Sequence, residues 1–218
     1  MKNKFNLSQK QNRFLVKKNF VNMVYSNSKF EGVNTTLPQT QTIIDGMSVG
    51  GVPMADIQVI VNLKKGLEFV LAHDEPFTIE VSKKINSIVA ADDALEPGEI
   101  RNGNVQIGGI AYEPPVPQPA EVSRQFDSMM HAQLSDTEKA LRIMYDIMRQ
   151  QLFWDGNKRT ATLSANYILI NAGAGILNIS EQQLEKFNDL LSADYESGDV
   201  AEILNWTYDN CIYGIEYR

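Results

Sequence analysis

The segment Gln151–Arg159 lies between two stretches of strong helical periodicity, and this arrangement constrains the fold more than any other feature of the sequence. The capping sequence Ser135-Asp136-Thr137-Glu138 predicts the start of the first helix, with apolar residues at helical spacing after it. A second apolar helix is predicted from about residue 159 to residue 171, and Gly173 suits its end. Residues 135–175 are therefore expected to form a helix–loop–helix unit.

The rest of the chain also shows mostly helical patterns. Apolar spacing predicts a helix over residues 8–30, closed by Glu31-Gly32, and two more over residues 57–72 and 77–91. The capping sequence Ser180-Glu181-Gln182-Gln183 predicts the start of another helix. A last helix carries Ile203, Leu204, Trp206 and Tyr208.

Residues 96–120 break this helical pattern. Residues 104–109 predict a short strand and turn, and residues 113–119 contain four prolines, which favour a stiff, extended chain. Either a surface hairpin or a β flap over a site fits this pattern. The expected fold class is mostly α, a helical bundle with a short β-hairpin flap, in a single domain of residues 1–218.

Composition excludes several classes of function. The net charge of −7 disfavours general nucleic-acid binding, and Cys211 is the only cysteine, so no intramolecular disulfide can form. His73 and His131 are far apart in sequence, so a His-rich or Cys/His zinc site is not expected. There is no apolar signal-peptide region and no stretch near the ~20 apolar residues of a membrane span, so we expect a cytoplasmic protein.

The loop itself has the residue types of an anion site with a metal. Gly156 and Asn157 tolerate a left-handed backbone, which lets successive N–H groups face one concavity at the start of a helix. Lys158 and Arg159 add positive charge, and an arginine can bind phosphate through two parallel hydrogen bonds. Asp155 would be repelled by phosphates unless a cation such as Mg²⁺ lay between them.

An ordinary helix–loop–helix corner is the alternative, because Asp-Gly-Asn is also good turn chemistry. A Walker A loop is excluded, because its first glycine is missing and no strand precedes the segment. Phe153 is expected to point into the core and hold the loop in place.

The segment resembles the signature of Fic-domain proteins, His-Pro-Phe-x-(Asp/Glu)-Gly-Asn-(Gly/Lys)-Arg, at Phe153, Asp155, Gly156, Asn157, Lys158 and Arg159. Residues 103–119, with Val105-x-Ile107-Gly108-Gly109 and a double proline, look like the family's flap, which holds the target segment. Residues 26–32 look like the family's inhibitory-helix motif, (Ser/Thr)-x-x-x-Glu-(Gly/Asn), placed near the N-terminus.

The resemblance implies a Fic-type helical bundle with an N-terminal inhibitory region at residues 1–34 and a flap at residues 100–120. Family members usually transfer AMP from ATP to a Ser, Thr or Tyr hydroxyl of a protein, so ATP, Mg²⁺ and a protein target are expected. A bacterial source is also expected, and the sequence leaves a homo-oligomer open. The implied roles are metal binding by Asp155, phosphate binding by Gly156, Asn157, Lys158 and Arg159, inhibition by Glu31, and target docking by Val105, Ile107 and Gly108.

Gln151 occupies the position of the family's catalytic histidine, and Leu152 replaces the motif proline. A glutamine amide cannot act as a general base and can only orient a hydroxyl or water, and losing a general base typically costs ~10²–10⁴-fold in rate. Neither His73 nor His131 is an evident replacement. ATP binding is therefore expected more firmly than efficient AMP transfer.

Two other positions depart from the family pattern. Thr162 replaces an arginine that, in many adenylylating members, holds the γ-phosphate and pairs with the inhibitory glutamate. Glu31 would then pair with Arg159 or with nothing, which predicts weak inhibition. Members of the Asn-Lys-Arg form without the second arginine include one that transfers a phosphoryl group, so the transferred group stays open. Asn27 replaces the first Ser or Thr of the inhibitory motif.

Two hypotheses follow. In the first, the chain is a protein adenylyltransferase weakened by Gln151, with Gln151 and Arg159 as the residues at the reacting centre. A variant of this hypothesis is phosphoryl transfer or AMP removal, the latter with Glu31 aligning a water. In the second, the chain is a catalytically inactive protein that binds a nucleotide or a target.

Overall fold

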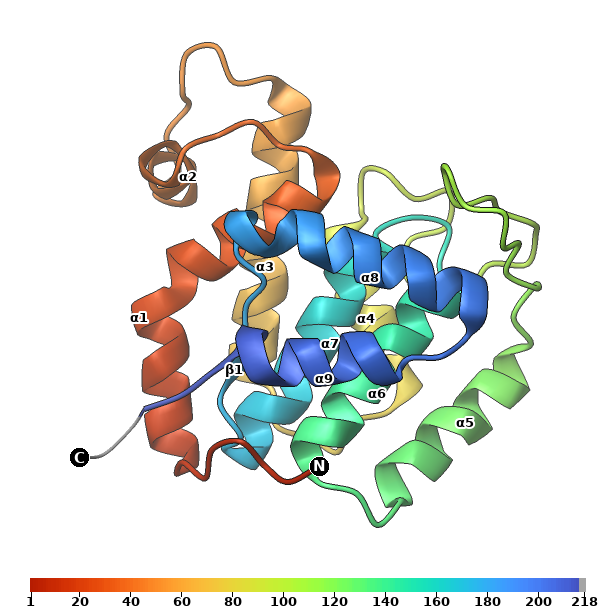
Figure 1. Ribbon diagram of the computed structural model, residues 1–218. Helices are drawn as coiled ribbons and strands as arrows, with labels where there is room; N and C mark the ends of the chain where they lie inside the picture. Colours follow the sequence, from red (N-terminus) through yellow and green to blue (C-terminus); the bar gives the residue numbers. More distant parts are fainter. Residues whose placement is uncertain (216–218) are drawn as a thin grey trace.

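Helix α7 (Asn157–Ala172) lies at the centre of the computed structural model, which describes residues 1–215 (Figure 1). Every residue of α7 from Arg159 to Ile170 is buried. A helix that is buried on all sides must have neighbours on every face. Its contacts with four other helices supply them: α1 (Gln9–Ser28), α3 (Met54–Ala72), α4 (Ile79–Val89) and α6 (Asp136–Gln150).

The buried polar residues of α7 are matched by partners on neighbouring segments. The Ser164 hydroxyl lies 2.9 Å from the Ser82 hydroxyl of α4. The Asn166 amide bonds both the N–H and the carbonyl of Leu177, each at 2.9 Å. Because a buried polar group without a partner is costly, these pairs fix how α7 sits against its neighbours.

The C-terminal part of the chain forms a cover over the α6–α7 pair (Figure 1). Strands β1 (Ile176–Leu177) and β2 (Ile212–Tyr213) are antiparallel, with Ile176 opposite Tyr213 and Leu177 opposite Ile212. Between them lie the 3₁₀ turn η2 (Glu181–Gln183), α8 (Leu184–Ser197) and α9 (Ala201–Cys211). Figure 1 shows α8 and α9 side by side in front of α6 and α7.

The predicted helices are confirmed. The one predicted over residues 8–30 forms as α1 followed by the 3₁₀ turn η1 (Lys29–Glu31), which ends at Gly32 in the left-handed region (φ 69°). Both halves of the capping box at Ser180 and Gln183 are present, but the box opens η2 before α8 begins. At the start of α6 only Ser135 caps, because the Glu138 side chain pairs with Arg142 instead. Phe153 is fully buried, as expected.

Residues 100–120, called the flap below, contain no strand in the described structure. The expected strand and turn at residues 104–109 reduce to a turn in which the Ile110 N–H bonds the Ile107 carbonyl at 3.1 Å. One isolated bridge joins Ile100 to Phe153 at the base of the flap. The expected strand of the flap is therefore not formed. The two-stranded sheet of the described residues lies elsewhere, at β1 and β2.

Two helices were not predicted. Helix α5 (Pro119–His131) begins at a proline that suits the first helical position, although the proline run suggested extended chain. Helix α2 (Leu37–Ile44) is capped by Thr36 and lies between the helices predicted over residues 8–30 and 57–72. Among the described residues, no helix is long and apolar enough to cross a membrane.

Gly66 of α3 lies against side chains of both α4 and α7. A Cβ added at Gly66 would lie 2.6 Å from Val89 Cγ1 and 2.8 Å from Leu163 Cδ1, both in the core. We expect Gly66→Ala to lower the free energy of unfolding by about 1–2 kcal/mol, because overpacking outweighs the gain in helix propensity. Urea unfolding measures this, with Gly50→Ala as control because that site is open. Equal stability of the Gly66→Ala and parent proteins would show that the core yields there.

Candidate functional site

The predicted site residues meet in one cavity of about 520 Å³ between the flap, α8, η1 and the loop before α7. Residues 151–159 are called the motif loop below. The cavity is lined by Phe30, Glu31, Gln106, Ile107, Gly108, Ile110, Gln151, Trp154, Asp155, Gly156, Asn157, Lys158, Asn188, Leu191, Ser192 and Tyr195. Arg159 lies beneath this lining, and Val105 is half-buried beside it rather than part of it.

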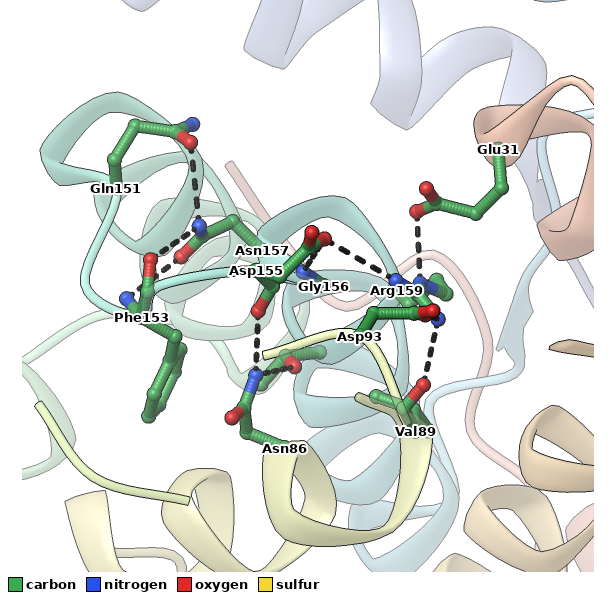
Figure 2. A network of polar contacts seen from close by, with 11 residues as sticks. Glu31, Asn86, Val89, Asp93, Gln151, Phe153, Asp155, Gly156, Asn157 and Arg159 are labelled. Atoms are coloured by element: carbon green, nitrogen blue, oxygen red, sulfur yellow. Dashed lines mark hydrogen bonds and ion pairs between the residues drawn. The ribbon is translucent and has the colours of Figure 1, made fainter. Parts of the chain in front are cut away.

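Asn157 closes the motif loop from inside. Its Oδ1 accepts a hydrogen bond from the Phe153 N–H at 2.9 Å, and its Nδ2 donates to the Phe153 carbonyl at 2.8 Å (Figure 2). The same Nδ2 donates to Gln151 Oε1 at 3.2 Å. The Asn157 side chain is therefore committed to the loop, and what it offers to a ligand is its backbone N–H.

Gly156 occupies a position that only glycine fits without strain. Its φ is +70°, and a Cβ there would lie 2.9 Å from the Ala90 Cβ. The Asn86 amide of α4 fixes the same turn by donating to the Asp155 carbonyl at 2.9 Å and to Thr160 Oγ1 at 3.0 Å (Figure 2). Asn86 was not found from the sequence, because nothing in its helical pattern distinguishes it from a solvent-facing amide.

The first turn of α7 faces the cavity with unpaired donors. Gly156 is the N-cap and supplies no side-chain acceptor, so the amides of the following residues lack helical partners. Lys158 lines the cavity beside them. Burial lowers the pKa of Lys158, and the nearby Glu31 carboxylate opposes that shift. Helix amides and a half-buried ammonium together form a site for an anion.

The Arg159 guanidinium is 1% exposed and is surrounded by carboxylates (Figure 2). Its Nε lies 2.7 Å from Glu31 Oε1, an ion pair outside hydrogen-bond direction. Nη1 donates to Asp93 Oδ2 at 2.9 Å and to the Val89 carbonyl at 2.6 Å, and Nη2 donates to Asp155 Oδ1 at 3.3 Å. Arg159 can therefore bind a phosphate only if one of these partners moves away.

Glu31 is the partner that sits on a short 3₁₀ turn at the cavity edge. That turn is held by Lys29, whose Nζ donates to the carbonyls of Val33 and Thr35 and pairs with Glu181 at 3.4 Å. Burial raises the pKa of Glu31 above its usual value, although the Arg159 guanidinium acts in the opposite direction. Ionised Glu31 is thus costly to bury and depends on its arginine.

The charges around Arg159 fit a divalent cation that arrives with phosphates. Three carboxylates, those of Glu31, Asp93 and Asp155, face two cationic side chains. Asp155 is 48% exposed, and its Oδ2 accepts no hydrogen bond from any described residue, whereas Oδ1 accepts from the Gly156 N–H at 2.5 Å. Among the described residues, no three His, Cys, Asp or Glu side chains are placed so that they could hold a metal ion together. A Mg²⁺ ion would therefore be held by the Asp155 carboxylate and by phosphate oxygens.

Gln151 ends α6 in the left-handed region (φ 46°) and is the only non-glycine residue with positive φ in the described chain. Its Nε2 donates to the Met148 carbonyl at 2.6 Å and lies 3.5 Å from the Tyr195 hydroxyl. Burial raises the pKa of Tyr195 well above its usual value, so this phenol does not replace a general base. Neither His73 nor His131 lines the cavity, as the sequence indicated.

Residues 76–169 match the model of the Fic/DOC family. The matched segment contains α6, the motif loop and most of α7. The chain is 25% identical over 207 residues to the Protein adenylyltransferase Fic of Aedes aegypti, covering 88% of this chain and 40% of that protein. It is 26% identical over 196 residues to the Drosophila melanogaster protein of the same name, covering 85% and 39%. The chain thus spans about 40% of the length of these curated relatives.

Solved structures show the same fold. A Fic domain containing signaling protein from Bacteroides thetaiotaomicron superposes with a TM-score of 0.76 at 19% identity, covering 93% of this chain and 86% of that one. Fic-1 from C. elegans gives a TM-score of 0.76 at 20% identity, covering 93% and 63%. The fold is therefore the mostly helical Fic fold, and within it this chain has the two-stranded antiparallel sheet of β1 and β2.

The structure brings most of the predicted site residues together and adds others. Asp93, Asn86 and Tyr195 contact the predicted residues but were missed, because each reaches the site from a separate helix or loop with no local motif. Trp154 also lines the cavity, and its half-buried ring lies against Gly103 at the base of the flap.

The bonds of Asn157 lead to a stability prediction. Asn157→Ala leaves the buried Phe153 amide without its acceptor, which should lower the free energy of unfolding by about 2–4 kcal/mol. Chemical denaturation measures the difference. The matched control is Asn188→Ala, because Asn188 also lines the cavity but is exposed, and its side chain makes no hydrogen bond to the described residues. A loss below about 0.5 kcal/mol for Asn157→Ala, within the usual range of surface changes, would contradict this account of the loop.

Proposed function

We propose that this protein binds ATP with Mg²⁺ and acts as a protein adenylyltransferase of low rate. The observation that carries the proposal is the convergence in one cavity of the α7 amides, Lys158 and the unbonded Asp155 Oδ2, facing the flap. The likeness to proteins named adenylyltransferase supports the same reaction. Because the chain spans only about 40% of those relatives, its activity and targets are proposed rather than transferred.

In this proposal, the amides of Asn157 and Lys158 and the Lys158 ammonium hold the phosphates, and Asp155 holds Mg²⁺. The metal would neutralise phosphate charge and orient the phosphate chain. The target lies along the flap, with Ile107 and Gly108 at the cavity.

The transfer itself replaces one phosphorus–oxygen bond by another. The hydroxyl oxygen of the target bonds the α-phosphorus, the bond from that phosphorus to the oxygen bridging to the β-phosphate breaks, and pyrophosphate leaves. Gln151 cannot accept the hydroxyl proton, so the proton passes to water or to a phosphate oxygen, and the rate is low. Orientation and charge stabilisation by the rest of the site survive this loss.

Glu31 is proposed to inhibit by occupying Arg159. The γ-phosphate would take the place of the Glu31 carboxylate on Nε, while Asp93 and Asp155 stay on the other two nitrogens. Thr162 stands where many adenylylating members have a second arginine, and it supplies no positive charge for the γ-phosphate. Its hydroxyl donates to the Lys158 carbonyl at 2.9 Å. The pairing of Glu31 with Arg159 supports the first of the two alternatives that the sequence left open.

A catalytically inactive nucleotide-binding or target-binding protein is the second candidate. The commitment of the Gln151 amide to Met148 and Asn157 favours it, because both ends of that amide are already hydrogen-bonded. AMP removal, with Glu31 aligning a water, and phosphoryl transfer are the remaining variants, and a labelling experiment separates them.

Labelled ATP tests the reaction. We expect slow transfer of label from α-labelled ATP, but not from γ-labelled ATP, to proteins of a bacterial lysate in the presence of Mg²⁺. Arg159→Ala should abolish the transfer, and Gln151→His should raise its rate by about 10²–10⁴-fold by supplying a general base. Label from γ-labelled ATP would show phosphoryl transfer instead.

Each result of this experiment bears on a separate claim. ATP binding without transfer, with full transfer on Gln151→His, would favour the inactive-protein hypothesis. Loss of label from proteins that already carry AMP would show the reverse reaction. If Asp155→Ala leaves Mg²⁺-dependent ATP binding unchanged, Asp155 is not the metal ligand.

Removal of the Glu31 carboxylate should strengthen ATP binding. Glu31→Ala frees one side of Arg159 while Asp93 and Asp155 still neutralise it, so we expect about tenfold tighter ATP binding, or ~1.4 kcal/mol. Isothermal titration calorimetry measures the dissociation constant. Glu185→Ala on the exposed first turn of α8 is the control. Equal affinity in the Glu31→Ala and parent proteins would remove the inhibitory role.

A further inference from the structure

Arg101 at the start of the flap is the most buried cationic side chain outside the motif loop. It is 1% exposed, and no carboxylate of the described chain lies within ion-pair distance. Burial lowers the pKa of its guanidinium. A buried charge without a counter-ion is costly, so its hydrogen bonds must compensate for lost water.

The Arg101 guanidinium donates only to backbone carbonyls, and these come from three separate segments. Nε and Nη2 donate to the carbonyls of Gln151 (2.5 Å) and Gln150 (3.0 Å) at the end of α6. Nη1 donates to the Gly103 carbonyl at 2.6 Å, near the first residues of the flap. Nη2 also donates to Pro114 and Pro115, at 3.2 and 2.8 Å, where the flap returns.

The flap has few other backbone hydrogen bonds. Between residues 102 and 116 the described backbone makes one internal hydrogen bond, from the Ile110 N–H to the Ile107 carbonyl. Tyr112 lies under the Arg149 guanidinium, with 4.1 Å from the guanidinium carbon to the ring centroid. The Trp154 ring lies against Gly103. With no strand ladder, the flap is held by the packing of Ile107, Ile110 and Tyr112 against the core and by the polar contacts at its two ends.

We propose that Arg101 is a positioning residue that fixes the flap over the motif loop. It joins both ends of the flap to the carbonyls of Gln150 and Gln151. One side chain therefore sets the distance between the flap and the reacting centre. The cluster of carbonyls at the C-terminal end of α6 carries the negative end of the helix dipole, which suits a cation. The inference rests on the proposed function only in taking the flap as the docking edge.

Arginine is required by this geometry rather than by charge alone. Its planar fork presents five N–H donors in fixed directions, whereas a lysine ammonium presents three from a single point. Arg101→Lys should keep the charge at the α6 terminus and preserve the fold. It should lose the bonds to at least one end of the flap. Arg101→Gln should lose both the charge and most of these bonds.

Hydrogen exchange of the nucleotide-free protein tests the proposal. We expect Arg101→Lys to raise exchange of the Ile110 amide, which is the hydrogen-bonded amide of residues 102–116, by about tenfold, while exchange in α7 stays within about twofold of the parent. Arg101→Gln should give a larger rise. Arg124→Gln is the matched control, because Arg124 lies on α5 with a 75% exposed side chain and pairs only with the nearby Glu121 and the Ala120 carbonyl.

Tryptophan emission supplies an independent readout. The chain has two tryptophans, so a Trp206→Phe background leaves Trp154 as the only reporter. Trp154 lies against the base of the flap, so its emission should shift to the red and become more open to acrylamide quenching in Arg101→Lys. ATP affinity should stay within about twofold of the parent in that variant.

The outcomes separate this inference from the proposed function. Unchanged flap exchange and unchanged Trp154 emission in Arg101→Lys would overturn the inference, even if ATP binds. A uniform rise in exchange across α6 and α7 would also overturn it, because Arg101 would then serve the whole fold. A chain that binds no ATP but shows the local rise would contradict the proposed function and leave the positioning role supported. If Arg101→Gln does not fold, Arg101→Lys decides.

Discussion

The burial of α7 on all its faces is the constraint on which the rest of the structure depends. A central helix that is surrounded along its length can present unpaired backbone groups to a ligand only at its ends. At its C-terminus the Gly173 N–H closes back on the Ile170 carbonyl, whereas the N-terminus opens into the cavity. The core thus determines where the anion site lies before any charged side chain is considered, and the flap and α8 only enclose it.

Burial also explains the charge arrangement around Arg159. A guanidinium in the core requires partners, and here three carboxylates and a carbonyl supply them from four segments. These contacts tie η1, α4 and the motif loop to α7, so the contacts that stabilise the fold also occupy the arginine that is proposed to bind phosphate. Removing one carboxylate leaves the charge paired by the others, which is why exchange of Glu31 for a phosphate does not require unfolding of the site.

Local patterns in the sequence predicted most of the helices and the motif loop, whereas most long-range contacts were missed, apart from the pairing of Glu31 with Arg159 that the resemblance left open. The caps at Ser135 and Ser180 and the turn at Gly156 depend on neighbouring residues, so their effects are visible in a short window. Asp93 and Arg101 act on residues 50 or more positions away. Their roles depend on tertiary packing, and a single aspartate or arginine in a loop gives no periodic signal. The flap strand was expected because its residues suit one, yet no partner strand lies beside it.

The departure at Gln151 can be understood from the two sets of bonds that meet there. Asn157 holds the Gln151 side chain from the loop, and Arg101 holds the Gln151 carbonyl from the flap. The backbone of residue 151 is in the left-handed region, and a different side chain there would lose the contact with Asn157 but not the bond of the carbonyl to Arg101. In the proposed site, nucleotide binding depends on α7, Lys158 and Asp155, while proton transfer depends on the side chain at residue 151 alone. A substitution there therefore removes the base without disturbing the groups that bind and orient, and binding and catalysis become separable in this fold.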